Sequence, residues 1–178
     1  MGGKARPAGE PADHALGRSR GGFGSKLHLV CDANRLPLAV VVTAGQRQEC
    51  TQFEAVMDAV RVRRPGRGRP RSRPAAVAGD KGYSYPHSRR WLRRHGIEAV
   101  IPRRSDQRPG DGRHRFDRAA YRRRAGIEPC VGWLKEHRAV GTRFDTLAVN
   151  FRATVQLAMI RSYLRVLVRA GIDPSDKA

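Results

Sequence analysis

The sequence predicts an α/β domain in which helices are layered on a sheet. Apolar spacing along the chain gives elements in the order strand, strand, helix, strand, helix, strand, helix, helix. Strands that alternate with helices in this way are typical of an α/β sheet with helices packed on it. A length of 178 residues fits one domain.

The first part of the domain is predicted to be a β-hairpin over residues 25–43. Residues 26–29 alternate polar and apolar side chains, as a half-buried strand does. Residues 32–34 supply turn-forming side chains. Residues 36–43 are nearly all apolar and rich in β-branched side chains, which is typical of a strand covered on both faces.

Helices and short strands are predicted for the rest of the domain. Apolar residues at the spacing of one helix face predict a helix over about 51–62 (Phe53, Val56, Met57 and Val60). A short buried strand over 75–78, a helix over 86–95 and a strand over 99–101 follow. A helical pattern from Phe116 to His137 is interrupted by Gly126 and Pro129, and residues 147–168 predict a long amphipathic helix.

The remaining segments are predicted to lie outside this domain or on its surface. Residues 1–24 are rich in Gly, Pro and Arg, which predicts a flexible basic arm. The domain itself is expected to span 25–169, with a tail over 170–178. Two basic stretches, 61–74 and 103–115, are too poor in apolar residues to pack a core and are predicted to be exposed loops.

The charge of the chain predicts a polyanionic partner. Lys and Arg number 36 against 16 Asp and Glu, which gives a formal net charge of +20. Phosphate binding would relieve this self-repulsion, so nucleic acid is the expected partner. The alternative is that a GC-rich genome has enriched arginine at neutral surface positions.

Other classes of protein are excluded by composition. No apolar run approaches the roughly 18 residues that span a bilayer, so no membrane partner is expected, and the first ten residues do not form a signal peptide. The three cysteines form no CxxC pair, so neither a zinc site nor a disulfide framework is indicated. A cytoplasmic, nucleoid-associated protein is expected.

Two sets of residues could carry chemistry. Asp80 follows a predicted strand and could hold a metal ion or, equally well, close a turn. Tyr121, Arg124, Glu128 and Lys135 would share one stripe of a continuous helix, about 60° wide at 3.6 residues per turn. Such a stripe could bind a metal ion and phosphates, or it could be a helix face of ordinary ion pairs.

The spacing Tyr121-x2-Arg124-x3-Glu128-x6-Lys135 resembles the YREK signature of the DDE transposases of bacterial insertion sequences. Further stretches resemble the same family and keep its order along about residues 15–167. They are residues 15–22, residues 26–29, Gly79-Asp80-Lys81-Gly82-Tyr83, Ile101-Pro102-Arg103-Arg104 and Arg143-Phe144-Asp145.

This resemblance implies a fold, a site and a set of partners. The fold would be RNase H-like, with a mixed sheet flanked by helices. Three carboxylates of the family bind two Mg²⁺ or Mn²⁺ ions that act on a phosphodiester. Asp80 matches the second carboxylate and Glu128 the third. The DNA of the transposon ends and the target would be the partner, and a homodimer is possible. Six residues would contact DNA: Tyr121, Arg124, Lys135, Lys81, Arg103 and Arg104.

The sequence departs from the family in two places. The first Asp of the family lies on a strand before the block that begins at Ala15, and no residue here matches it: Asp13 is too close to the block, and Asp32 lies in the hairpin turn. The domain is therefore expected to be incomplete at its N-terminal side. Pro129 stands where the family usually has arginine, and it predicts a kink, or a helix that ends near Ala125 and restarts at Pro129.

Three functions remain open from the sequence. The first is a transposase fragment that cleaves and joins DNA at insertion-sequence ends, with the first Asp supplied by an upstream reading frame or a partner chain. The second is a DNA-binding remnant of a decayed transposase. The third is a basic RNA-binding module, which the ordered motif blocks argue against.

Overall fold

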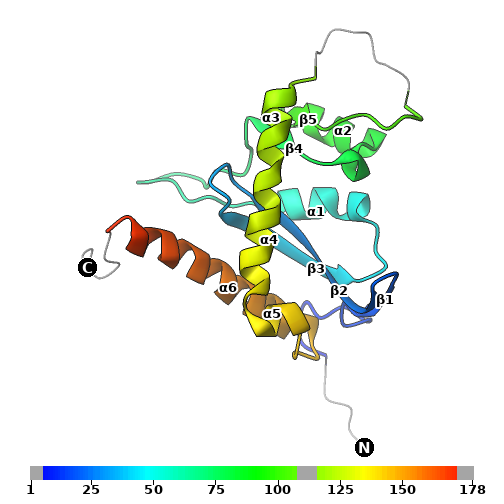
Figure 1. Ribbon diagram of the computed structural model, residues 1–178, viewed down its shortest axis with the longest axis vertical. Coiled ribbons are helices and arrows are strands. Elements are labelled where there is room, and N and C mark those ends of the chain that lie inside the picture. Colours follow the sequence, from blue (N-terminus) through cyan, green and yellow to red (C-terminus); the bar gives the residue numbers. More distant parts are fainter. Residues whose placement is uncertain (1–5, 108–115, 172–178) are drawn as a thin grey trace, which may run out of the picture.

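Figure 1 shows the computed structural model, which describes residues 6–107 and 116–171. Five strands form two sheets, one antiparallel with three strands in the order β1-β2-β3, and one parallel pair, β4-β5. In chain order the strands are β1 (Gly17–Ser19), β2 (Gly22–Cys31), β3 (Pro37–Ala44), β4 (Ala76–Ala78) and β5 (Glu98–Val100).

Helices and helical turns connect and cover these sheets, so the predicted α/β class is confirmed. They are η1 (Glu49–Gln52), α1 (Phe53–Asp58), η2 (Lys81–Tyr83), α2 (Pro86–Arg94), α3 (Arg118–Arg123), η3 (Arg124–Gly126), α4 (Ile127–Lys135), α5 (Arg138–Thr142) and α6 (Ala148–Arg169). In the described part of the chain, no helix is long and apolar enough to cross a membrane.

The predicted hairpin is confirmed, and it is longer than the sequence pattern indicated. β2 pairs with β3 in antiparallel register from Ser25 opposite Ala44 to Cys31 opposite Pro37. The turn is closed by Asp32, whose carboxylate accepts hydrogen bonds from the backbone N–H groups of Asn34 (2.9 Å) and Leu36 (2.8 Å). An Asp side chain that bonds to the backbone in this way stabilises a tight turn.

Both faces of the hairpin are covered, as its apolar composition predicts. On one face, Leu27, Leu29 and Val42 pack with Val40 against α4 and α6, where Leu134, Phe151 and Val155 are buried. The opposite face carries Val30, Ala39 and Val41, which pack against Val56 and Val60 at α1.

Helix α1 also forms the wall of a second core. Phe53 and Met57 of α1 pack against Trp91 and Leu92 of α2 and against Ile101 after β5. The Phe53 and Trp91 rings meet edge to face with centroids 5.9 Å apart, an arrangement that aromatic rings favour. The helix is shorter than the predicted 51–62, because residues 49–52 form the tighter turn η1 and the helix ends at Asp58.

Strand β4 is less buried than predicted. Ala76 and Ala78 are exposed and Val77 is half-buried, whereas strands in a parallel sheet are normally covered on both faces. In the structure, β4 pairs with β5 alone among the described residues. The missing burial follows from the absence of a second neighbouring strand there.

The interruption predicted within the helical pattern of residues 116–137 lies at Arg124–Gly126, which ends three residues before Pro129. α3, η3 and α4 form a nearly straight column in Figure 1, with the 3₁₀ turn η3 at Arg124–Gly126. Pro129 is the third residue of α4, a position whose N–H has no partner within its own helix in any case. Proline therefore costs little here, and neither a kink at Pro129 nor a restart at Pro129 is observed.

The described residues before Ser25, which begin at residue 6, are part of the fold rather than a detached arm. β1 pairs with the start of β2, and Ala15 is buried. The buried carboxylate of Glu10 accepts hydrogen bonds from the backbone N–H groups of Ala148 and Val149, both at 2.9 Å. It thereby satisfies two of the unpaired donors at the first turn of α6.

Arg143 fixes this segment to the rest of the domain. Its guanidinium donates to the carbonyl oxygens of His14 (2.7 Å) and Ala15 (2.9 Å) and to the Ser25 hydroxyl. It also bonds to the carbonyl oxygens of Asp145 (2.9 Å) and Thr146 (3.1 Å), in the loop between α5 and α6. Arg143 has φ = +50°, which is a strained backbone conformation for a residue other than glycine. These hydrogen bonds therefore also hold the loop in this conformation.

Removing this guanidinium will destabilise the domain. We expect Arg143→Ala to lower the free energy of unfolding by about 2–4 kcal/mol, because several carbonyl groups lose a charged donor. Arg152→Ala, an exposed arginine on α6, is the control and should change it by less than about 0.5 kcal/mol. Urea unfolding followed by circular dichroism measures both, and equal small changes would contradict the role of Arg143.

His28 is a buried histidine on the α1 face of β2. Its Nε2 lies 2.8 Å from the Thr43 hydroxyl, and the residue is 2% exposed. Burial and, to a smaller extent, the charge of Lys26 lower the pKa of His28 from 6.5 to about 4. The imidazole is therefore neutral in the folded protein at neutral pH.

This burial predicts a loss of stability at mildly acidic pH. Below pH 6.5 the unfolded chain binds a proton at His28, and the folded chain does not do so until about pH 4, so stability falls as the pH is lowered through this window. We expect a loss on the order of 1–3 kcal/mol from this residue.

The measurement is the free energy of unfolding between pH 7.5 and 5, with His28→Gln and the control His137→Gln. The first variant should flatten the dependence and the second should keep it. A wild-type slope in His28→Gln would assign the effect to other groups.

Candidate functional site

Asp80 directly follows β4 and closes the turn that leads into η2. Its Oδ1 accepts a hydrogen bond from the backbone N–H of Gly82 at 2.8 Å, so it acts as the N-cap of this short 3₁₀ helix. A Cβ on Gly82 would lie 2.9 Å from that oxygen, so glycine is needed for the close approach. The turn-closing role that the sequence analysis gave as the alternative for Asp80 is therefore present, and Asp80 is half-buried.

Glu49 is a second carboxylate beside Asp80, which the sequence analysis missed. The same ideal Cβ position on Gly82 lies 3.8 Å from Oε2 of Glu49, so the two carboxylate oxygens are less than about 7 Å apart. Glu49 begins η1, which packs against η2. In the sequence, only the position of Glu49 just after the predicted hairpin could have indicated a functional role. That indication is weak, because Glu49 belongs to no motif.

Two neighbouring side chains, Tyr83 and Lys26, interact with this pair of carboxylates. Burial and the charges of Glu49 and Asp80 raise the pKa of Tyr83, so this phenol stays protonated. The Lys26 ammonium lies 3.8 Å from Glu49 Oε1 and donates to the Arg47 carbonyl oxygen at 2.9 Å. The turn thus gathers two carboxylates, a phenol and one ammonium group within a small region.

Glu128 lies on a different element, in the first turn of α4, and its side chain is exposed. The structure gives no direct interaction between Glu128 and Asp80. α3, which leads into this column, does lie against β4. The predicted closeness of Asp80 and Glu128 therefore stays a prediction.

The predicted stripe around Glu128 is altered by η3. Residues of a 3₁₀ helix advance by about 120° rather than 100°, so the turn at Arg124–Gly126 rotates Glu128 and Lys135 relative to Tyr121. Tyr121 and Arg124 remain together, with the guanidinium 5.4 Å from the ring centroid. Lys135 is exposed at the end of α4.

The other predicted DNA contacts differ in how exposed they are. Lys81 and Arg103 are exposed. Arg104 is half-buried, and it bonds to Asp106 (3.2 Å) and to the Tyr85 hydroxyl (3.0 Å). The charge of Asp106 and, to a smaller extent, Tyr85 raise the pKa of Arg104. Arg104 therefore has a structural role that accounts for its place in the loop.

The stretch over residues 61–74 projects from the body of the domain (Figure 1). It is called the basic arm from here on, and it is distinct from the arm predicted over residues 1–24. Val62 and Arg71 pair as an antiparallel bridge, with N···O distances of 2.8 and 2.7 Å, so the arm folds back on itself. Its seven arginines are all exposed: Arg61, Arg63, Arg64, Arg67, Arg69, Arg71 and Arg73. In the second basic stretch, residues 108–115 lie outside the described residues.

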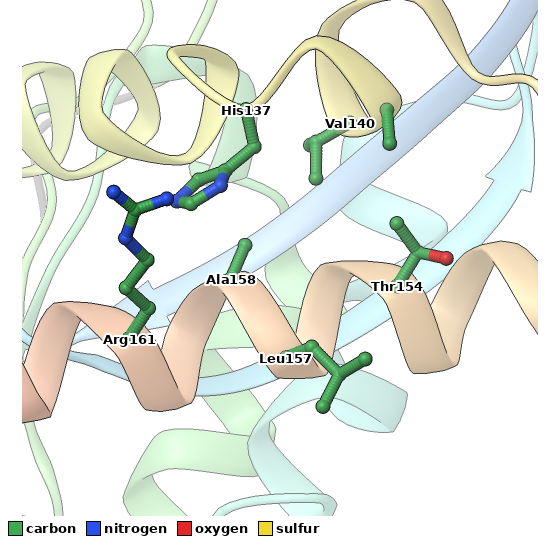
Figure 2. A pocket seen from close by; sticks show the side chains of 7 residues that line it. His137, Val140, Thr154, Leu157, Ala158 and Arg161 are labelled. Atoms are coloured by element: carbon green, nitrogen blue, oxygen red, sulfur yellow. The ribbon is translucent and has the colours of Figure 1, made fainter.

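A shallow pocket of about 230 Å³ opens between α5 and α6, away from these residues (Figure 2). Figure 2 shows the side chains of His137 and Arg161 at one end of it and Thr154 at the other. Its lining contains none of the residues predicted from the motifs. The lining residues are His137, Ala139, Val140, Thr154, Leu157, Ala158 and Arg161.

The described residues provide an incomplete donor set for two metal ions. Carboxylate oxygen is the appropriate ligand chemistry for Mg²⁺, and Asp80 and Glu49 supply it. However, no group of three or more His, Cys, Asp or Glu side chains gathers within the described ranges. By itself this arrangement does not fit a two-metal centre.

Comparisons with known proteins identify the family. The transposase DDE domain family matches residues 4–162. The chain is also 37% identical over 126 residues to a protein of Burkholderia cepacia named as a transposase for insertion sequence element IS402. That match covers 70% of this chain and 56% of the relative, so the chain spans just over half the length of that protein. No solved structure matches.

The family match contains both Asp80 and Glu128 and extends from the N-terminal segment into α6. It therefore joins the separated motif blocks into one domain, and the chain belongs to the DDE transposases of insertion sequences.

Proposed function

We propose that this chain is the larger part of a DNA transposase domain with an RNase H-like sheet, and that it cleaves and joins DNA at insertion-sequence ends after another segment completes the sheet. The observation that carries the proposal is the pair of open strand edges on β2 and β4. The family uses divalent metal ions, and Mg²⁺ or Mn²⁺ would supply the stabilisation of charge on the phosphate.

The open edges indicate where the completing strand would lie. β2 has β1 beside it only at Gly22–Gly24, and the stretch from Lys26 to Cys31 has β3 as its one strand partner among the described residues. β4 likewise pairs only with β5 there. Unpaired edges are templates for strand addition, and the exposed alanines of β4 require cover. A strand between β2 and β4 would meet both needs.

Such a strand would also supply the missing carboxylate. A strand next to β4 places one of its ends beside the turn that holds Asp80. The chain's own groups have defined tasks in this arrangement: Asp80 and Glu128 are the matched metal ligands, and Gly82 fixes the Asp80 carboxylate. Tyr121 and Arg124 would approach the DNA of the transposon ends, while the exposed side chains of Lys81 and Arg103 would contact phosphates.

The basic arm is proposed as the main phosphate-binding surface. Its seven exposed arginines lie within 13 residues, and guanidinium groups bind phosphate oxygens in a bidentate manner. Its antiparallel bridge gives it a folded base, so the charges are presented from a defined place in the domain. This surface would hold DNA whether or not the catalytic site is complete.

A DNA-binding remnant without catalysis is the second candidate function. It is favoured by one observation, the incomplete donor set within the described residues. The two candidates agree on DNA binding and differ in cleavage, so each is tested separately.

We expect tight DNA binding at low salt that weakens steeply as salt rises. The logarithm of the binding constant should fall by about 0.9 per phosphate contact for each unit of log salt concentration. Replacing Arg63, Arg64, Arg67 and Arg69 by Gln should reduce this slope by about 2–4. Fluorescence anisotropy with duplex DNA from 50 to 300 mM salt measures it.

A control with the same charge change replaces exposed arginines on α6: Arg152, Arg161, Arg165 and Arg169. It should retain most of the wild-type slope. Equal losses in both variants would show that binding follows net charge rather than the arm, and an absence of binding at 50 mM salt would refute the polyanion interpretation.

We expect the 178-residue chain to leave labelled insertion-sequence ends uncut in Mg²⁺, and a fusion that adds an Asp-bearing strand to cut them. In the fusion, Asp80→Asn and Glu128→Gln should each lower the rate at least about 100-fold, because positioning and charge stabilisation supply most of the acceleration. Asp58→Asn, an exposed carboxylate at the end of α1, is the matched control.

Each other outcome has a distinct meaning. Cleavage by the unfused chain that is lost in Asp80→Asn would show that the site is complete without the added strand. A fusion that binds the ends tightly and never cuts them would favour the DNA-binding remnant.

A further inference from the structure

Helix α6 carries a second apolar stripe, on the side opposite its buried face. The helix packs on the hairpin through the face that contains Phe151 and Val155. Successive residues turn by about 100°, so a second set of apolar residues lies on the other side of the helix axis. We call this set the outer stripe: Ala153, Leu157, Ile160, Leu164 and Leu167. Within it Leu157 is 67% exposed, Ile160 54% and Leu164 42%.

The spacing of the outer stripe is that of a coiled-coil seam. Its residues alternate at intervals of four and three, with Leu157 and Leu164 at the a positions of a heptad and Ile160 and Leu167 at the d positions. A repeat that averages 3.5 residues keeps such a stripe facing a partner helix along its whole length. A single exposed leucine needs no explanation, but a contiguous exposed apolar surface marks an interaction site.

The pocket between α5 and α6 opens beside this stripe. Leu157 and Arg161 both line it, and Figure 2 shows them on neighbouring turns of α6. Val140 and Ala158 add apolar lining, and the volume is about 230 Å³. Binding energy in protein interfaces is concentrated where a large side chain fills such a pocket. We expect one apolar side chain of a partner to enter here.

Charges beside the outer stripe select the sign of the partner. Arg161, Arg165 and Arg169 follow one another at intervals of four residues, and all three are exposed. α6 itself contains no Asp or Glu. Arg165 forms an ion pair with Glu136 at 3.0 Å, whereas within the described ranges no acidic side chain pairs with Arg161 or Arg169. Acidic side chains of a partner helix would complement this row of arginines.

A second copy of this chain fits the surface less well than an acidic partner. Two copies of α6 would bring together helices that contain arginine and no acidic residue, in chains of net charge +20 each. Like charges that face each other across an interface cost affinity.

We propose that the outer stripe of α6 is a docking surface for an acidic amphipathic helix of a partner protein. Apolar side chains of that helix would cover the stripe, one of them would fill the pocket, and its carboxylates would face the arginine row. This proposal goes beyond the proposed function and does not depend on it, because α6 carries none of the residues assigned to metal or DNA binding.

The test uses the full chain and a synthetic peptide of three heptads, with leucine at a and d and glutamate at e and g. Repulsion between the glutamates keeps the peptide from pairing with itself. We expect saturable binding of one peptide per chain at about 150 mM salt, where exposed charges are strongly screened. A peptide of the same composition in scrambled order should bind at least about tenfold more weakly. Fluorescence anisotropy of the labelled peptides measures both affinities.

Variants of the chain locate the binding surface. Leu157→Gln combined with Leu164→Gln should weaken binding of the heptad peptide at least about tenfold, and Arg161→Gln should weaken it about threefold to tenfold. Val166→Gln is the matched control and should bind like the wild type, because Val166 lies outside the stripe and is 42% exposed, as Leu164 is. Since all four residues are exposed, the thermal midpoint of each variant should stay within about 3 °C of the wild type.

Other outcomes would overturn the proposal. An absence of binding would remove the docking surface, and equal affinity for the scrambled peptide, or for the chain with both leucines replaced, would assign the attraction to net charge. A dimer in sedimentation velocity that the two leucine replacements abolish would assign the stripe to a second copy. Binding to phosphatidylserine vesicles that the same replacements abolish would assign it to a membrane surface.

Discussion

The position of helix α1 determines how the two sheets of this domain relate to each other. In the described part of the chain, the β2-β3 hairpin and the β4-β5 pair share no ladder of backbone hydrogen bonds. Apolar packing joins them instead: Val56 and Val60 at α1 pack on the hairpin, and Phe53 and Met57 pack on α2 beside β4 and β5. Hydrophobic packing is not directional, so the position of one sheet relative to the other depends on how the shapes of these side chains fit together. The turn that carries Asp80 and the turn that carries Glu49 both depend on this arrangement.

A second constraint closes the other end of the domain. Arg143 and Glu10 tie the segment before β1 to the start of α6, one through carbonyl groups and the other through two backbone N–H groups. Burial opposes ionisation of Glu10, but hydrogen bonds from Ala148, Val149 and His14 outweigh it and lower its pKa. The result is a charged cap that is fully formed at neutral pH. A segment that contributes few apolar residues thus gains its place through polar contacts.

The sequence predicted those elements that local spacing determines. The hairpin, α2 and α6 were recognised because alternation and helical periodicity are properties of neighbouring residues. Three features were not recognised, because each arises from contacts between distant segments: strand β1, the burial of Glu10 and the approach of Glu49 to Asp80. The break at η3 shows the same limit. Gly126 and Pro129 predicted an interruption, and the structure places it at Arg124–Gly126, where a Cβ on Gly126 would lie 3.3 Å from Arg35 Cγ.

One added strand, as proposed above, would account for both the open edges and the incomplete donor set of the described residues. A strand inserted between β2 and β4 would pair the unpaired backbone groups of both, cover the exposed alanines of β4, and bring a carboxylate to the turn at Asp80. Strand pairing and burial would then stabilise the sheet and assemble the metal ligands in a single step. Folding of the completed domain would then also fix the positions of these carboxylates. Completion of the sheet and formation of the catalytic site are therefore expected to be the same event.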